Sequence, residues 1–146
     1  MSLGVLFHGS PHSGLEVLRP HASAVIGGES AVFGTNSLWL ALVFAAAPSG
    51  SMLEFGFLNG RPYIAELEPR TLTCLQKRGY IYTISAEGFR RDARLGMEHH
   101  EFINNSDVDV LECYECDNVL SDLRNRCSNV TLVYYGEQEK FLQDNN

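Results

Sequence analysis

Hydrophobic and polar positions alternate with the period of a β-strand in several short stretches of the chain. These stretches cover residues 3–8, 31–34, 80–84, 108–116 and 130–135, and a further extended piece begins at Phe102. Two more stretches, 53–58 and 61–67, flank Asn59-Gly60, which is a strong signal for a two-residue hairpin turn. Pro62 indicates either an edge strand or the first part of a strand. The pattern predicts a fold dominated by antiparallel strands.

One stretch has the composition of a buried helix. Residues 38–47 carry no charged side chain, and a helix that is apolar on every face is buried on every face. Residues 35–37 (Thr-Asn-Ser) are good N-cap types, and residues 48–50 (Pro-Ser-Gly) end the helix. We therefore predict a buried helix at about 37–47. The weaker local patterns predict a turn or short helix at 15–18, a mobile glycine-containing loop at 22–30 and a short helix at 119–126.

Length, composition and charge narrow the classes of function. The 146 residues are 45% hydrophobic and 20% charged, which is typical of one ordered domain, expected to span 1–146. A net charge of −7 disfavours nucleic-acid partners, because phosphate contacts need clustered Lys and Arg. The longest apolar run falls short of the roughly twenty residues of a membrane span. Four cysteines without framework spacing favour a reducing, cytoplasmic setting.

Two common kinds of site find little support. Cys113 and Cys116 could form half of a zinc site, with His99 and His100 as further ligands. Residues three apart on a strand point to opposite faces, however, so we favour two buried thiols and expect no metal. Neither the nucleophile pattern GxSxG nor the phosphate-binding pattern GxxxxGK occurs, which disfavours hydrolases and P-loop enzymes.

Three separated segments carry residues suited to a flat, hydrogen-bonding ligand. The first is His8-Gly9-Ser10 at the end of a strand, where glycine allows close approach to the backbone. The second is Phe33-Gly34-Thr35, followed by Phe44 in the predicted helix. The third is Glu101-Phe102-Ile103, which opens a later strand. Taken singly, these segments are better explained structurally. His8-Gly9-Ser10 is then a strand-ending turn, the two phenylalanines are core residues, and Glu101 is a solvated loop acid.

In their order and spacing, these segments resemble the motifs of the ADP-ribosyltransferase superfamily, in its His-Tyr-Glu branch, which includes diphtheria toxin and the poly(ADP-ribose) polymerases. The resemblance implies an α+β fold in which two mostly antiparallel sheets enclose a cleft, with the helix at about 37–47 supporting one wall. It implies NAD as co-substrate and a glycosyltransferase reaction. That reaction cleaves the nicotinamide–ribose bond and transfers ADP-ribose to an unidentified acceptor. Proteins are one candidate class of acceptor.

The same resemblance implies a role for each motif residue. Glu101 and His8 would be catalytic, with Glu101 stabilising an oxocarbenium-like transition state and His8 bonding a ribose hydroxyl. Gly9 would offer its backbone to the nicotinamide carboxamide, and Phe33 and Phe44 would stack on the nicotinamide ring. The NAD-binding set that it implies is His8, Gly9, Ser10, Phe33, Thr35 and Phe44.

Departures from the motifs keep other functions open. Phe33 and Phe44 replace residues that are usually tyrosine in this branch, which preserves stacking and removes two hydroxyl groups. His99 stands where arginine-specific members carry Glu or Gln, and Glu98 lies one residue too early, so arginine modification is not expected. The acidic charge disfavours the related RNA 2′-phosphotransferases. The alternatives are an inactive module that binds NAD or another nucleotide, and a protein-interaction domain with no nucleotide site.

Overall fold

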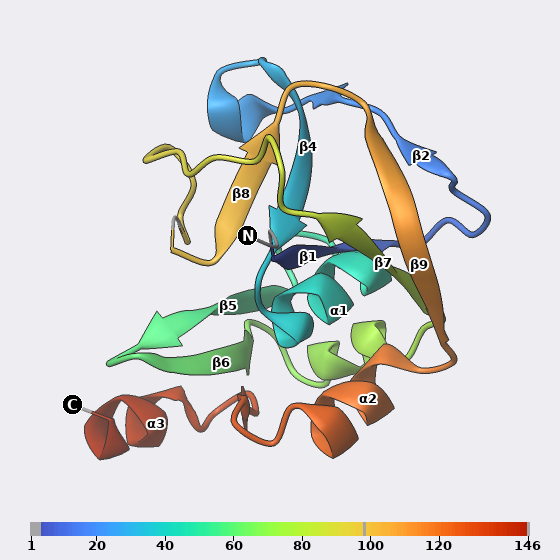
Figure 1. The fold of residues 1–146 in the computed structure, drawn as a ribbon. Coiled ribbons are helices and arrows are strands. Elements are labelled where there is room, and N and C mark those ends of the chain that lie inside the picture. Colours follow the sequence, from blue (N-terminus) through green and yellow to red (C-terminus); the bar gives the residue numbers. More distant parts are fainter. Residues whose placement is uncertain (1–3, 98, 146) are drawn as a thin grey trace.

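The structure is a computed structural model that describes residues 4–97 and 99–145, so Glu98 lies outside the described residues. The chain has an α+β fold with mostly antiparallel sheets, as predicted (Figure 1). In chain order the elements are β1 (Val5–Ser10), β2 (Val17–Leu18), β3 (His21–Ala22), the 3₁₀ turn η1 (Ala24–Ile26), β4 (Ser30–Thr35), α1 (Leu38–Ala46), β5 (Leu53–Leu58), β6 (Arg61–Glu66), the 3₁₀ turn η2 (Thr71–Leu75), β7 (Gly79–Ser85), β8 (Glu101–Asn104), β9 (Val108–Cys116), α2 (Val119–Arg126), β10 (Thr131–Val133) and α3 (Gln138–Asp144).

The larger sheet splits between β1 and β4. Within the described residues its strand order is β2-β9-β7-β1-β4-β3, and β8 pairs with the free side of β4. β1 pairs with β7 along its whole length, from Val5↔Ser85 to Ser10↔Tyr80. Its ladder with β4 consists of the single pair Phe7↔Thr35. The sheet is therefore continuous on one side of β1 and open on the other, next to His8.

The smaller sheet has the order β10-β6-β5. β5 and β6 form the predicted hairpin, and Asn59 and Gly60 both have positive φ, at 51° and 76°, as a type I′ turn requires. Pro62 lies at the start of β6, one residue before the pairing with β10 begins. β6 is the central strand of this sheet, so Pro62 does not mark an edge strand. The other prediction, that Pro62 lies in the first part of its strand, is correct. β10 runs parallel to β6, an exception in a mostly antiparallel fold.

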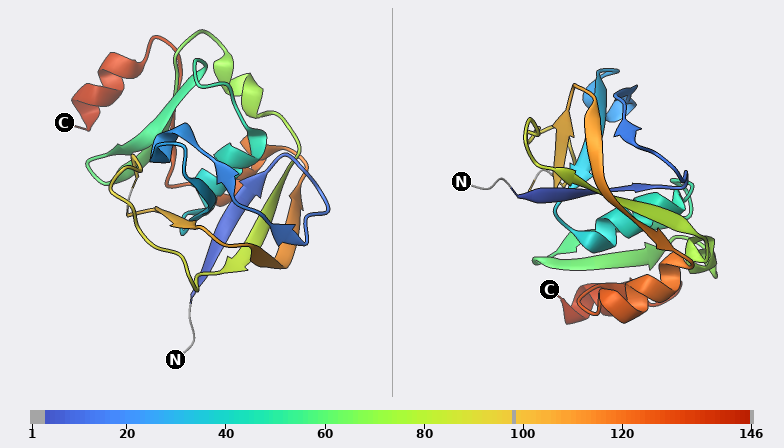
Figure 2. Two further views of the ribbon diagram at one scale, coloured as in Figure 1. Left: turned by 90° about the horizontal axis from the view of Figure 1, so that it is seen from above. Right: turned by 45° about the vertical axis from the view of Figure 1, so that its right-hand side comes forward.

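Helix α1 lies between the larger sheet and the β5–β6 hairpin (Figures 1 and 2). The predicted bounds, 37–47, are confirmed to within one residue, and seven of its residues are buried. The helix backbone comes very close to β1, since a Cβ on Gly9 would lie 1.8 Å from the carbonyl oxygen of Ala41. Gly9 is thus needed where the helix packs on the sheet, which sequence reasoning did not anticipate.

Some local predictions are wrong or incomplete. Residues 15–18 are not a turn or short helix, because Val17 and Leu18 form β2 against β9. The loop expected at residues 22–30 contains the turn η1 and is flanked by β3, and α3 was not predicted at all. α3 lies beside the hairpin (Figure 2). The rings of Phe141 and Tyr63 pack together there, with centroids 5.3 Å apart. Among the described residues, no helix has both the length and the apolar character needed to cross a membrane.

Replacing Gly9 with alanine is expected to lower the free energy of unfolding by about 3 kcal/mol, because the added methyl group overlaps the backbone of α1. Urea denaturation followed by circular dichroism measures this difference. Gly50→Ala is the matched control, since nothing lies within 4 Å of a Cβ at that position. Equal stability of the two variants would contradict the close packing of α1 on β1.

A candidate ligand site between the two sheets

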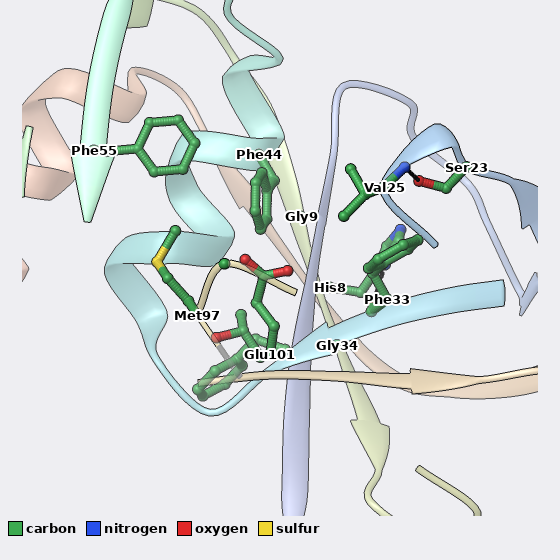
Figure 3. Close-up of a pocket in the computed structure, with 13 residues that line it drawn as sticks. His8, Gly9, Ser23, Val25, Phe33, Gly34, Phe44, Phe55, Met97 and Glu101 are labelled. Carbon is green, nitrogen blue, oxygen red and sulfur yellow. Dashed lines mark hydrogen bonds between the residues drawn. The ribbon is translucent and has the colours of Figure 1, made fainter. Parts of the chain in front are cut away.

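A cavity of about 530 Å³ opens beside the split in the larger sheet (Figure 3). Strands β1, β4 and β8 of the larger sheet line one side of it, and helix α1 and strand β5 line the other side. Ser23, Val25, Gly96 and Met97 also line it. We call it the central cavity. Six of the seven residues proposed for the site line it, namely His8, Gly9, Phe33, Thr35, Phe44 and Glu101.

His8 is held in one orientation. Its Nδ1 donates a hydrogen bond to the carbonyl oxygen of Phe33, 2.7 Å away, across the split between β1 and β4. Burial lowers the pKa of His8 below its usual value of 6.5, with the bond to Phe33 opposing that effect, so the ring is neutral at pH 7. A neutral ring whose Nδ1 carries the hydrogen has Nε2 as an acceptor. His8 can therefore accept a hydrogen bond from a ligand hydroxyl.

Glu101 places a carboxylate in the cavity. It is the first residue of β8 and pairs with Thr35 of β4. Burial raises its pKa to about 6. Within residues 4–97 and 99–145, no hydrogen bond or ion pair engages this carboxylate, so it remains available to a ligand. At pH 7 a group with this pKa is mostly ionised, and it can stabilise nearby positive charge.

Aromatic side chains approach the cavity from both sides of β1. In the view of Figure 3, His8, Val25 and Phe33 lie on one side of β1, and Phe44, Phe55, Met97 and Glu101 lie on the other. Phe44 meets Phe55 edge to face, with ring centroids 6.0 Å apart. Both phenylalanines of the motif are only partly buried, so their rings remain partly open to a ligand. The walls can hold a flat ring by stacking or edge contacts.

Thr35 and Ser10 have structural contacts that the sequence did not reveal. The Thr35 hydroxyl donates to the carbonyl of His100 at 2.6 Å and accepts from the backbone N–H of Ser37 at 3.0 Å. It thereby ties the start of α1 to the residue before Glu101, which positions that carboxylate. Ser10 is buried outside the central cavity, and its hydroxyl accepts from the N–H of His12 at 3.1 Å.

Two further recesses adjoin the central cavity. One, of about 540 Å³, shares His8, Ser23 and Phe33 with it. We call this the histidine recess because its other polar residues include His12, Arg19 and His21; none of its described lining residues is Asp or Glu. The other, of about 590 Å³, shares Phe55, Gly96 and Met97 and runs along the hairpin. The central cavity is thus the middle section of a longer groove.

Several lining residues have no signal in the sequence. Phe55 lies on the predicted hairpin, but nothing in its pattern separates a cavity wall from core packing. Val25 lies in the short 3₁₀ turn η1 and Met97 in a loop turn, and in both places a side chain's surroundings depend on tertiary structure. A motif search finds only positions that belong to a motif, so these residues could not have been identified that way.

The cysteine pattern has a simple structural explanation. Cys116 is buried as predicted, but the prediction that Cys113 is buried too is wrong. Cys113 is exposed, because residues three apart on strand β9 face opposite sides of the sheet. Burial raises the pKa of Cys116 to about 11, which disfavours the thiolate that a zinc ligand needs. His100 stacks on Phe57, with centroids 4.1 Å apart. In the part of the chain that the structure describes, no group of three or more His, Cys, Asp or Glu side chains is arranged to hold a metal ion.

Comparisons of this chain with protein-family models, with curated proteins and with solved structures give no match. No family is therefore shown. The function has to be inferred from the residues that line the groove and from their chemistry.

The raised pKa of Glu101 predicts a specific pH dependence of stability. The folded protein binds this proton more tightly than the unfolded chain, whose Glu titrates near 4.5. The free energy of unfolding should therefore fall by about 1 to 2 kcal/mol as the pH rises from 4.5 through 6. Above that range, Glu101 should cause no further change in the free energy of unfolding.

Glu101→Gln should remove that decrease, and urea denaturation at several pH values measures it. Glu112→Gln, at an exposed strand position, controls for the loss of one charge. The same decrease in Glu101→Gln would contradict the assignment.

Proposed function

We propose that this protein is an ADP-ribosyltransferase that uses NAD as its co-substrate. The observation that carries the proposal is the meeting, in one cavity, of His8 from β1, Phe33 from β4, Phe44 from α1 and Glu101 from β8. His8 and Glu101 are 93 positions apart in the sequence, so their meeting depends on the tertiary fold. The set supplies what the nicotinamide–ribose half of NAD requires: aromatic surfaces, a hydroxyl acceptor and a carboxylate.

The reaction follows from these groups. The bond between the ribose C1′ and the nicotinamide nitrogen breaks, and its electron pair leaves with nicotinamide, which becomes neutral. Positive charge then develops on the ribose ring, where the ionised Glu101 stabilises it. A lone pair of the acceptor forms the new bond to C1′, and the acceptor's proton passes to solvent. His8 would orient the ribose through the Nε2 acceptor.

The histidine recess supports a dinucleotide rather than a smaller ligand. NAD carries a negatively charged pyrophosphate next to the nicotinamide ribose. In a protein with a net charge of −7, this recess joins the central cavity at His8 and carries the ring nitrogens of His12 and His21. Its Arg19 is also cationic, and it pairs with Asp107 at 2.7 Å. Cationic and N–H donor groups are the usual partners of phosphate oxygens. The remainder of NAD would extend into it from the central cavity.

A second candidate is a protein that binds NAD without turning it over. Phe33 and Phe44 present no hydroxyl group, and the Thr35 hydroxyl is already engaged with His100 and Ser37. Among the side chains proposed for the site, these features leave His8 and Glu101 as the polar groups that line the cavity and can act on the ribose. The two candidates differ in one measurable property, the release of nicotinamide.

Calorimetric titration with NAD, followed by chromatographic measurement of free nicotinamide, tests the proposal. The wild-type protein is expected to bind NAD and to release nicotinamide slowly with water as acceptor. Glu101→Gln should bind NAD within about threefold of the wild type and release nicotinamide about 100-fold or more slowly, because the variant lacks the charge that stabilises the transition state.

Glu112→Gln, a change at an exposed strand position, should behave as the wild type. Binding without release in the wild type would favour the non-catalytic candidate. Absence of NAD binding to the folded protein would contradict both.

A further inference from the structure

Residues 23–29 form a closed loop at the rim of the central cavity, which we call the rim loop. The backbone N–H of Ser23 donates to the carbonyl of Glu29 at 3.1 Å, and that of Gly28 donates to the carbonyl of Ser23 at 2.8 Å. Gly27 and Gly28 have φ values of 67° and 87°, which side-chain-bearing residues rarely adopt. The loop therefore has a defined shape set by its own backbone.

The rim loop presents an apolar side chain to the ligand site. Val25 is 58% exposed, and it lines the central cavity together with Ser23. Figure 3 shows it on the same side of β1 as His8 and Phe33. The next residue, Ile26, is fully buried in a small cluster with Leu95 and Ile103. One side chain of the turn thus anchors the loop while its neighbour faces the cavity.

Arg94 holds the rim loop from outside. Its Nη1 donates to the carbonyl oxygen of Ile26 at 2.9 Å, and its Nη2 donates to the carboxylate of Glu29 at 3.1 Å. Asp92 fixes the guanidinium in turn, accepting from Nε at 2.9 Å and from Nη2 at 2.6 Å. The same interactions lower the pKa of Asp92 and raise that of Arg94, so this pair stays charged at neutral pH.

A second arginine supports the same carboxylate. Arg90 donates from Nη2 to Glu29 at 3.0 Å, and Asn105 donates to Glu29 at 2.7 Å. Hydrogen bonds from Asn105, Arg94 and Arg90 lower the pKa of Glu29. Exposed ion pairs taken one at a time contribute little to stability. The contact that distinguishes Arg94 is its bond to a backbone carbonyl of the turn, which a planar guanidinium can make while it also pairs with two carboxylates.

From these contacts we propose that Arg94 is a positioning residue for the ligand site, which holds the rim loop, and with it Val25, against the central cavity. Arg94 does not line the cavity, so it acts through the loop. If Arg94 is removed, water can hydrogen-bond to the Ile26 carbonyl and to Glu29. We therefore expect the removal to change the position of the rim loop and to leave the overall fold intact. That NAD is the ligand rests on the proposed function; that Arg94 fixes the loop does not.

Hydrogen exchange measured by mass spectrometry or NMR tests the tether without any ligand. The amides of residues 25–29 all donate to acceptors inside the rim loop, so loosening the loop speeds their exchange. Arg94→Gln should exchange about tenfold faster at these amides and leave the rest of the chain unchanged. Arg91→Gln is the matched control, because Arg91 is exposed and no ion pair to it occurs in residues 4–97 and 99–145.

Kinetics with NAD then test the effect on the site. Arg94→Gln should raise the KM for NAD about fivefold and change kcat for nicotinamide release by less than twofold, because the reacting groups are untouched. Arg94→Lys should not restore the wild-type KM, since an ammonium group cannot reproduce the several directed hydrogen bonds of a planar guanidinium. Val25→Ala should raise the KM while exchange in the rim loop stays slow.

Each outcome decides one of the two claims. Unchanged exchange in Arg94→Gln overturns the proposed tether, whether or not NAD binds. Faster exchange with an unchanged KM overturns the role in the ligand site. Faster exchange in a protein whose wild type binds no NAD supports the tether and counts against the proposed function instead.

Discussion

A hydrogen bond of 2.7 Å from His8 to the carbonyl of Phe33 joins two strands that otherwise pair at only one position. An unbroken ladder between β1 and β4 would continue from Phe7↔Thr35 and close the sheet. The histidine ring bridges the split instead, which satisfies a backbone carbonyl and leaves the central cavity beside it. The same bond fixes the nitrogen that the ring offers to a ligand. One interaction therefore shapes the site and sets part of its chemistry.

Close packing of α1 against β1 positions one wall of the site. Gly9 lets the helix backbone touch the strand, so Phe44 reaches the cavity from a helix whose position is fixed. Thr35 joins the start of that helix to the turn that leads into Glu101. The ring that would stack and the carboxylate that would stabilise charge are thus positioned by one connected set of contacts. Such preorganisation is what electrostatic stabilisation of a transition state needs.

The elements with strong local patterns could be predicted from the sequence. The buried helix, the Asn59-Gly60 hairpin and α2 all have bounds within one residue of those observed. Strands of two residues could not be predicted, because β2 exists only through its pairing with β9. The motif residues meet in one cavity apart from Ser10, whereas Val25 and Arg94 could be found only once the loops were placed in three dimensions.

A crystal structure of the Glu101→Gln variant with NAD tests the central claim most directly, because the variant should hold NAD without consuming it. We predict that the nicotinamide ring lies in the central cavity against Phe33 and Phe44. We also predict a ribose hydroxyl within hydrogen-bonding distance of the Nε2 of His8, and the pyrophosphate in the histidine recess. NAD bound elsewhere on the protein, or a central cavity that stays empty at saturating NAD, would contradict the central claim.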